Sequence, residues 1–163
     1  MKFIMEQQLN VLKDTYTVTD EAGNLVSQIN SKVISLHRKR FIRDASGNVI
    51  FIIKGKLVDI LPTYYILDAN EREIGKAKKK FNPRAHFKLE LGGEKYNVQG
   101  TMFRRSYRIS GANGEIGTIH KDGFRMFKDK YEIEVNQKND VFKLILMTSI
   151  VDMLYFNGKR SHD

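Results

Sequence analysis

Length, composition and charge set the first limits on this protein. With 163 residues the chain is long enough for one domain with a sizeable core, and its lack of cysteine excludes disulfide bonds and thiolate metal sites. Its 28 Lys and Arg residues against 19 Asp and Glu residues give a net charge of +9, which favours an anionic partner. A domain whose lysines only solvate its surface is the alternative explanation of the same charge.

The chain up to about residue 135 reads as short strands separated by turns. Apolar and polar residues alternate in His86–Leu91 and again in Lys130–Val135. Gly92-Gly93 has the composition of a hairpin turn and leads from the first of these segments into Glu94–Val98. Such alternation is typical of antiparallel strands with one apolar face.

A repeated hairpin unit underlies this pattern. Asp20, Asp44 and Asp68 are each twenty-four residues apart, and each opens a tight turn between two strands; a fourth copy has Gly111 in place of the aspartate. Aspartate side chains bond to turn backbone, and glycine supplies the positive φ that such turns need. Because Glu71 stands where the other copies have glycine, we expect the third turn to differ. Consecutive hairpins of this kind predict an antiparallel meander.

The most apolar stretch of the chain is Val141–Phe156, near the C-terminus. Twelve of its sixteen residues are apolar, and they fall on nearly all sides of a helix. Asn139 and Asp140 are suited to begin a helix, and Asn157-Gly158 to end it. A membrane span needs roughly 18–20 mostly apolar residues, which is more than this stretch offers. We therefore predict a helix over about residues 140–156 that is buried all round.

Joining the meander to the helix predicts the fold. A meander of about a dozen strands has two edges to hide, and closing it into a barrel removes them. A barrel that wide is not filled by its own side chains, so the apolar helix fits its lumen. We predict a mostly β protein (α+β in some schemes), with a single domain over residues 1–163. Strands over about residues 2–135 form a closed antiparallel barrel of about twelve strands around a buried C-terminal central helix.

Asp152 is the carboxylate that the predicted helix carries inside the barrel. An unpaired buried carboxylate is costly. We therefore expect Asp152 to meet an arginine, a hydroxyl group or a backbone N–H.

The whole chain resembles a known family. The D-x-x-G-N hairpins, the M-F-R-R-S-Y-R-I segment at Met102–Ile109 and the apolar C-terminal helix are similar to those of the LURP-one-related proteins, in particular their bacterial YxjI-like branch. That family is related by fold to the tubby C-terminal domain and the phospholipid scramblases, so the resemblance implies a tubby-like barrel around a central helix. The tubby relatives bind phosphoinositides through basic side chains. The motifs that match the family lie in turns and in the core. They therefore predict the fold, but they identify no binding-site residues in this chain.

Three clusters of basic residues form the candidate binding surface. Each Lys or Arg near an anionic membrane contributes about 1 kcal/mol, so one cluster could support reversible association. The candidate residues are Arg38, Lys39, Arg40, Lys78, Lys79, Lys80, Arg84, Arg104 and Arg105.

The sequence carries no recognisable catalytic or cofactor motif. Its four histidines are scattered without metal-ligand spacing, and it contains no P-loop, nucleophile elbow or dinucleotide fingerprint. We therefore expect no enzymatic activity, no metal and no cofactor.

The leading hypothesis is a non-enzymatic binding module that associates reversibly with an anionic phospholipid surface or a phosphorylated ligand. The first alternative is a protein-interaction or stress-response scaffold with an unknown protein partner and no ligand. Nucleic-acid binding is a second, less favoured alternative: Phe81 and Phe103 beside basic residues could stack on bases, but no helix is free to enter a groove. The N-terminal residues lack a signal-peptide pattern, so we expect a cytoplasmic protein. We also expect a monomer without a transmembrane segment that can associate peripherally with the membrane.

Overall fold

A computed structural model describes residues 1–8, 15–34, 36–56, 62–81, 84–101, 103, 105–123 and 128–156. In these ranges the chain forms twelve strands, then a short 3-10 helix, η1 (Lys138–Asp140), and one α-helix, α1 (Val141–Tyr155). The strands are β1 (Lys2–Gln8), β2 (Thr15–Asp20), β3 (Leu25–Ile34), β4 (His37–Asp44), β5 (Val49–Lys56), β6 (Thr63–Leu67), β7 (Glu73–Lys79), β8 (His86–Leu91), β9 (Glu94–Gly100), β10 (Ser106–Gly111), β11 (Gly114–Lys121) and β12 (Lys130–Val135).

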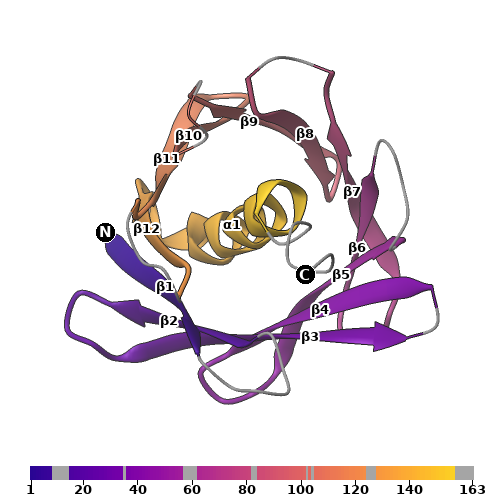
Figure 1. Cartoon of the computed structure of the whole chain (residues 1–163), viewed down its shortest axis with the longest axis horizontal. Helices are drawn as coiled ribbons and strands as arrows, with labels where there is room; N and C mark the ends of the chain where they lie inside the picture. Colours follow the sequence, from indigo (N-terminus) through magenta and orange to yellow (C-terminus); the bar gives the residue numbers. More distant parts are fainter. Residues whose placement is uncertain are drawn as a thin grey trace.

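The strands form one closed barrel. Each strand pairs antiparallel with its neighbour in the sequence, and β1 pairs with β12 to close the sheet. Closure leaves the sheet without an exposed edge. Figure 1 looks along the barrel and shows α1 inside the ring of strands. The predicted closed barrel of twelve antiparallel strands around a C-terminal helix is confirmed.

The repeated turns are built alike. The Oδ1 atom of Asp20 accepts hydrogen bonds from the backbone N–H groups of Ala22 and Asn24, at 3.0 and 2.8 Å. Asp44 and Asp68 accept the corresponding pairs of bonds. Donation by these backbone groups and by an asparagine side chain lowers the pKa of the Asp20 and Asp44 carboxyls below 3.8.

The expectation that the third turn differs is wrong. Glu71 adopts a positive φ of 62°, and its N–H donates to the carbonyl of Asp68 as that of Gly23 does to Asp20. A non-glycine residue in this conformation costs about 1–2 kcal/mol. The Glu71 carboxylate accepts a charged hydrogen bond of 2.8 Å from Lys39 Nζ, which offsets part of that cost.

The central helix is buried on every side, as predicted. Twelve of its 15 residues are buried, and the other three, Phe142, Lys143 and Leu154, are half-buried. Asp140 occupies the N-cap position, but its carboxylate caps no backbone group and instead pairs with Lys143 at 3.2 Å. The predicted stop at Asn157-Gly158 lies outside the described residues.

The inward halves of the strands supply the rest of the core. Buried isoleucines of four successive strands, β3 to β6, belong to the same core as the helix, together with buried tyrosine and phenylalanine side chains. A methyl group on the Cα of Gly117 in β11 would clash with the backbone carbonyl of Glu134 in β12 and come within 3.1 Å of the Leu144 side chain of α1. The missing side chain therefore lets the helix approach this wall of the barrel.

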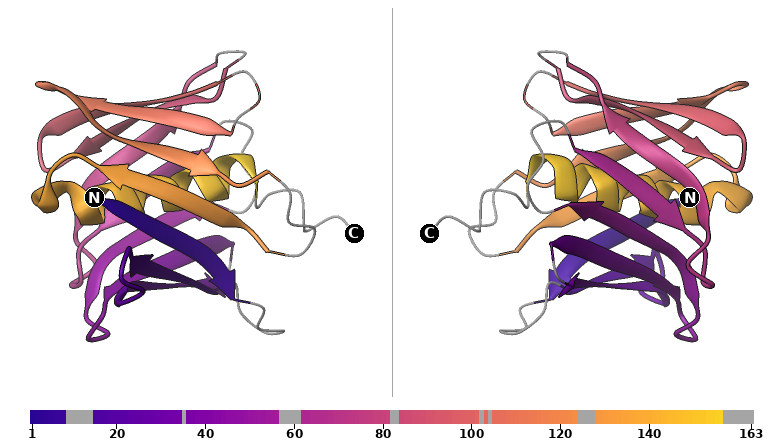
Figure 2. Two further views of the ribbon diagram at one scale, coloured as in Figure 1. Left: turned by 90° about the vertical axis from the view of Figure 1, so that its left-hand side faces the viewer. Right: turned by 90° about the vertical axis from the view of Figure 1, so that its right-hand side faces the viewer.

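The barrel has two unlike ends. At one end α1 begins and the three aspartate turns lie; we call it the turn end. At the other end α1 finishes, and we call it the exit end (Figure 2). Because the strands alternate in direction, the connections β3–β4, β7–β8 and β9–β10 are all at the exit end.

Candidate functional site

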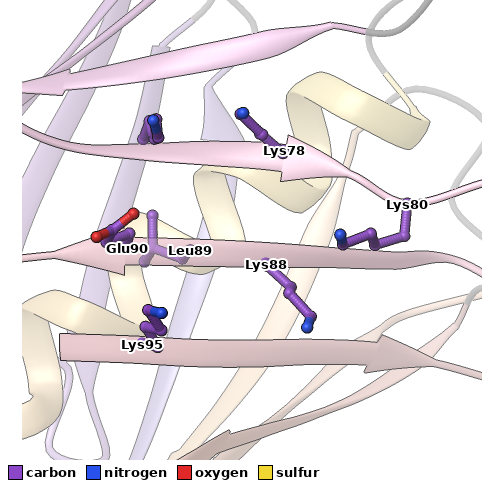
Figure 3. Close-up of a pocket in the computed structure, with 7 residues that line it drawn as sticks. Lys78, Lys80, Lys88, Leu89, Glu90 and Lys95 are labelled. Carbon is purple, nitrogen blue, oxygen red and sulfur yellow. The ribbon is translucent and has the colours of Figure 1, made fainter.

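Five lysines gather on the outer wall of β7, β8 and β9 around a hollow of about 310 Å³, which we call the lysine groove. Figure 3 shows their side chains projecting from three neighbouring strands, on the side of the sheet away from α1. A single carboxylate, Glu90, shares the hollow with them. The lysines of the groove are Lys76, Lys78, Lys80, Lys88 and Lys95.

Strand register brings these lysines together. Lys78 in β7 lies directly opposite Lys88 in β8. Lys76 lies opposite Glu90, which in turn lies opposite Lys95 in β9. Like charges directly opposite each other on one face of a sheet are destabilising. The Lys78–Lys88 pair is therefore a local cost to folding that a bound anion would relieve.

The charge of the groove is largely uncompensated. Within the described part of the chain, no carboxylate lies within ion-pair distance of any of the five lysines. Four of them are exposed and Lys76 is half-buried. Such a surface can hold phosphate or carboxylate oxygens through several ammonium groups at once.

The other predicted basic residues do not join one surface. Lys39 in β4 is tied to Glu71, three strands away from the groove, and Arg38 on the same strand is half-buried. Arg84 and Arg105 are exposed near the exit end, and Arg84 lines a second hollow of about 510 Å³ with Arg108. Arg104 lies outside the described residues.

Lys79 belongs to the other face of β7. It lies two residues after buried Ala77, and its ammonium group sits 5.4 Å from the centre of the Tyr155 ring of α1. The alternation of a strand separates Lys79 from Lys78 and Lys80, although the three are consecutive in the sequence.

Arg40 is not a surface residue, which corrects its place in the predicted binding surface. Its side chain is fully buried, and its Nη2 lies 2.9 Å from Oδ2 of Asp152. Its Nε donates to the Ser31 hydroxyl at 3.0 Å and its Nη1 to the Ser149 carbonyl at 3.2 Å. Arg40 lies two residues before buried Ile42 on β4, so strand alternation already pointed it inward.

The expected partner of Asp152 is thus an arginine together with two hydroxyls. The hydroxyls of Tyr131 and Tyr16 donate to its Oδ1 at 2.7 and 3.0 Å. The Arg40 guanidinium also lies over the Tyr16 ring, 5.2 Å from its centre. This buried cluster joins β2, β4 and β12 to the helix, and it fixes where α1 sits in the barrel.

The cluster makes the folded protein less stable as the pH becomes alkaline. Burial, and then the nearby Asp152 charge, hold the pKa of the Tyr131 hydroxyl well above 10.0. The unfolded chain ionises this group near pH 10 while the folded protein keeps it protonated. The contribution of Tyr131 to stability is therefore fully present below about pH 10 and is lost as pH rises toward the higher folded-state pKa.

Above about pH 10 we expect the unfolding free energy of Tyr131→Phe to fall less steeply than that of the parent, by up to about 1.4 kcal/mol per pH unit. Urea unfolding at pH values on either side of about 10 measures this difference, and parallel curves would contradict it.

Among the described residues, no three histidine or carboxylate side chains gather in a way that could hold a metal ion. No helix in the described ranges has the length and apolar content needed to cross a membrane.

A closed antiparallel barrel threaded by an apolar helix is the architecture of the tubby-like proteins. The family model described as LURP-one-related matches residues 1–152, so the chain belongs to the LURP-one-related family. The resemblance inferred from the sequence is confirmed.

One solved structure with this fold is an Arabidopsis thaliana protein determined by X-ray crystallography. It is 17% identical to the chain, and the match covers 93% of this chain and 90% of the plant protein with a TM-score of 0.60. At this identity the likeness supports the fold alone. A search of curated protein sequences gave no significant match.

Sequence reasoning missed Lys88 and Lys95 as members of the groove. Alternation alone places both on the outer face of β8 and β9. Alternation does not supply the register that sets Lys88 beside Lys78, because six residues separate β7 from β8 and no two-residue hairpin sequence fixes how the strands pair.

Proposed function

We propose that the protein is a non-enzymatic, cytoplasmic binding module that associates reversibly with anionic membrane surfaces through the lysine groove. The observation that carries this proposal is the gathering of five lysines from three strands with one carboxylate among them. The opposed Lys78 and Lys88 support it further, because their repulsion has no structural benefit in the barrel.

The strength of such binding follows from the number of charges. At about 1 kcal/mol per lysine near an anionic bilayer, five lysines give an association of moderate strength that can reverse. The interaction is screened over a Debye length of about 8 Å at physiological salt, so it should weaken as salt is added.

The buried carboxylate supports a binding role over a catalytic one. Asp152 is the fully buried acid of the core, and its oxygens are engaged by Arg40 and two tyrosine hydroxyls. It serves the fold, and it does not face the groove.

Vesicle flotation tests the proposal. The protein is floated with vesicles of phosphatidylcholine alone and of phosphatidylcholine with phosphatidylserine, at low and physiological salt. We expect binding to the anionic vesicles only. The triple variant Lys78→Glu, Lys80→Glu, Lys88→Glu should abolish it, since it turns the groove acidic. Lys79 is left unchanged because its side chain faces the helix.

A control with the same change in charge separates the groove from net charge. Lys2, Arg72 and Lys138 are exposed near the turn end, and their reversal to glutamate should preserve most of the binding. Equal loss in both triple variants would mean that only the total charge matters.

If the parent does not float but binds tripolyphosphate at the groove, the ligand is a soluble phosphorylated molecule. If it binds neither, the protein-interaction scaffold becomes the leading hypothesis.

A further inference from the structure

The four most exposed large apolar side chains of the described residues all lie at the exit end. Phe81 is 98% exposed, Phe103 86%, Leu36 72% and Val33 63%. Val33 is the penultimate residue of β3, and the others lie in the connections β3–β4, β7–β8 and β9–β10. At the turn end, by contrast, Asp, Asn and Gly dominate the connections, and the exposed apolar side chains Met1 and Leu25 are only 49% and 37% exposed.

These side chains are placed around the rim and do not form one patch. Leu36 follows β3, whereas Phe103 follows β9, six strands further on in a barrel of twelve, and so on the opposite side of the ring (Figure 1). Phe81 lies between them. Separate apolar tips around one end of a barrel suit a partner that is broad, flat and deformable. A lipid bilayer has these properties, and a folded protein with a preformed pocket does not.

Cations accompany the apolar tips. Lys80 directly precedes Phe81 and belongs to the lysine groove, so the groove runs up to the exit end at this point. Exposed Lys32 precedes Val33, and exposed Arg105 lies two residues after Phe103. Aromatic and aliphatic side chains flanked by Lys or Arg are typical of protein surfaces that lie in the headgroup region of an anionic bilayer.

We propose that the exit end inserts these apolar side chains into the boundary between headgroups and acyl chains of an anionic membrane. The inference rests on the proposed function and adds an orientation to it. The exit end faces the bilayer, the part of the lysine groove that ends at Lys80 lies next to its headgroups, and the turn end faces away. Binding then has an apolar component that salt does not screen, in addition to the charged one.

The absence of tryptophan from the chain permits a direct test. The variants Phe81→Trp and Phe103→Trp each place a single tryptophan at the exit end, and Leu25→Trp places one at the turn end as a matched control. Each is mixed with phosphatidylserine vesicles that contain phosphatidylcholine brominated on its acyl chains. We expect a blue shift of emission and quenching by bromine for the two exit-end variants, and neither for the Leu25 variant.

Apolar insertion is tested independently by the double variant Phe81→Ser, Phe103→Ser. Removing two inserted rings should weaken the partition into anionic vesicles by about tenfold or more, with little change in its dependence on salt. Vesicle binding without a blue shift or quenching at either position would overturn the insertion and leave the groove proposal standing. Absence of any vesicle binding by the parent would overturn both.

Discussion

Replacing Asp152 with alanine is expected to cost about 3–5 kcal/mol of unfolding free energy, because it leaves a charged guanidinium buried without its counter-ion. The Arg40 and Asp152 side chains are both 0% exposed, so water cannot take the place of the lost partner. The hydroxyls of Tyr16 and Tyr131 also lose the acceptor that they share. Urea unfolding of the purified variant, compared with the parent, measures the loss.

The partner residues provide graded controls for this prediction. Tyr16→Phe and Tyr131→Phe each remove one hydrogen bond to the carboxylate and should each cost about 1.5–3 kcal/mol. The double variant Arg40→Met, Asp152→Leu removes both charges and fills similar volume, so it should recover most of the stability lost by Asp152→Ala. If the double variant were as unstable as the single one, the loss would come from altered packing and not from an unpaired charge.

Replacing Leu146 or Ile150 with aspartate is expected to abolish soluble expression. Both side chains are fully buried between α1 and the barrel wall, and a carboxylate there would have no partner. An isolated buried charge costs more than the net stability of a typical domain, about 5–15 kcal/mol. The soluble yield after expression, with the parent expressed in parallel, gives the first measurement.

A milder change at the same position keeps this prediction quantitative. Leu146→Ala should fold and lose about 2–5 kcal/mol by urea unfolding, since it opens a cavity against the barrel wall. Leu154 is only half-buried on the same helix, so Leu154→Ala should lose clearly less. An aspartate variant at Leu146 that expressed and melted like the parent would contradict a helix enclosed by the barrel.

The inward position of Arg40 shows which part of the predicted binding surface was wrong and what in the sequence could have corrected it. The candidate binding surface predicted from the sequence includes Arg38, Lys39 and Arg40 together. Strand alternation with Ile42, together with the need of Asp152 for a cation, already favoured an inward arginine. The same alternation separates Lys79 from Lys78. The two-residue alternation of the strand therefore predicts which basic side chains face outward better than their clustering in the sequence does.

The strands, the turns at Asp20 and Asp44 and the central helix could be predicted from the sequence alone, because each depends on neighbours in the chain. Alternation defines the inner face, Asp20 and its repeats build their own turns, and an all-apolar helix needs a closed wall around it. The lysine groove and the apolar exit end were decided only by the tertiary structure. Register across connections of variable length places Lys88 beside Lys78, and closure of the ring spreads the tips of three distant connections around the rim of one end. The register is not encoded in any short stretch of residues, since it follows from the balance of all the strand pairings together.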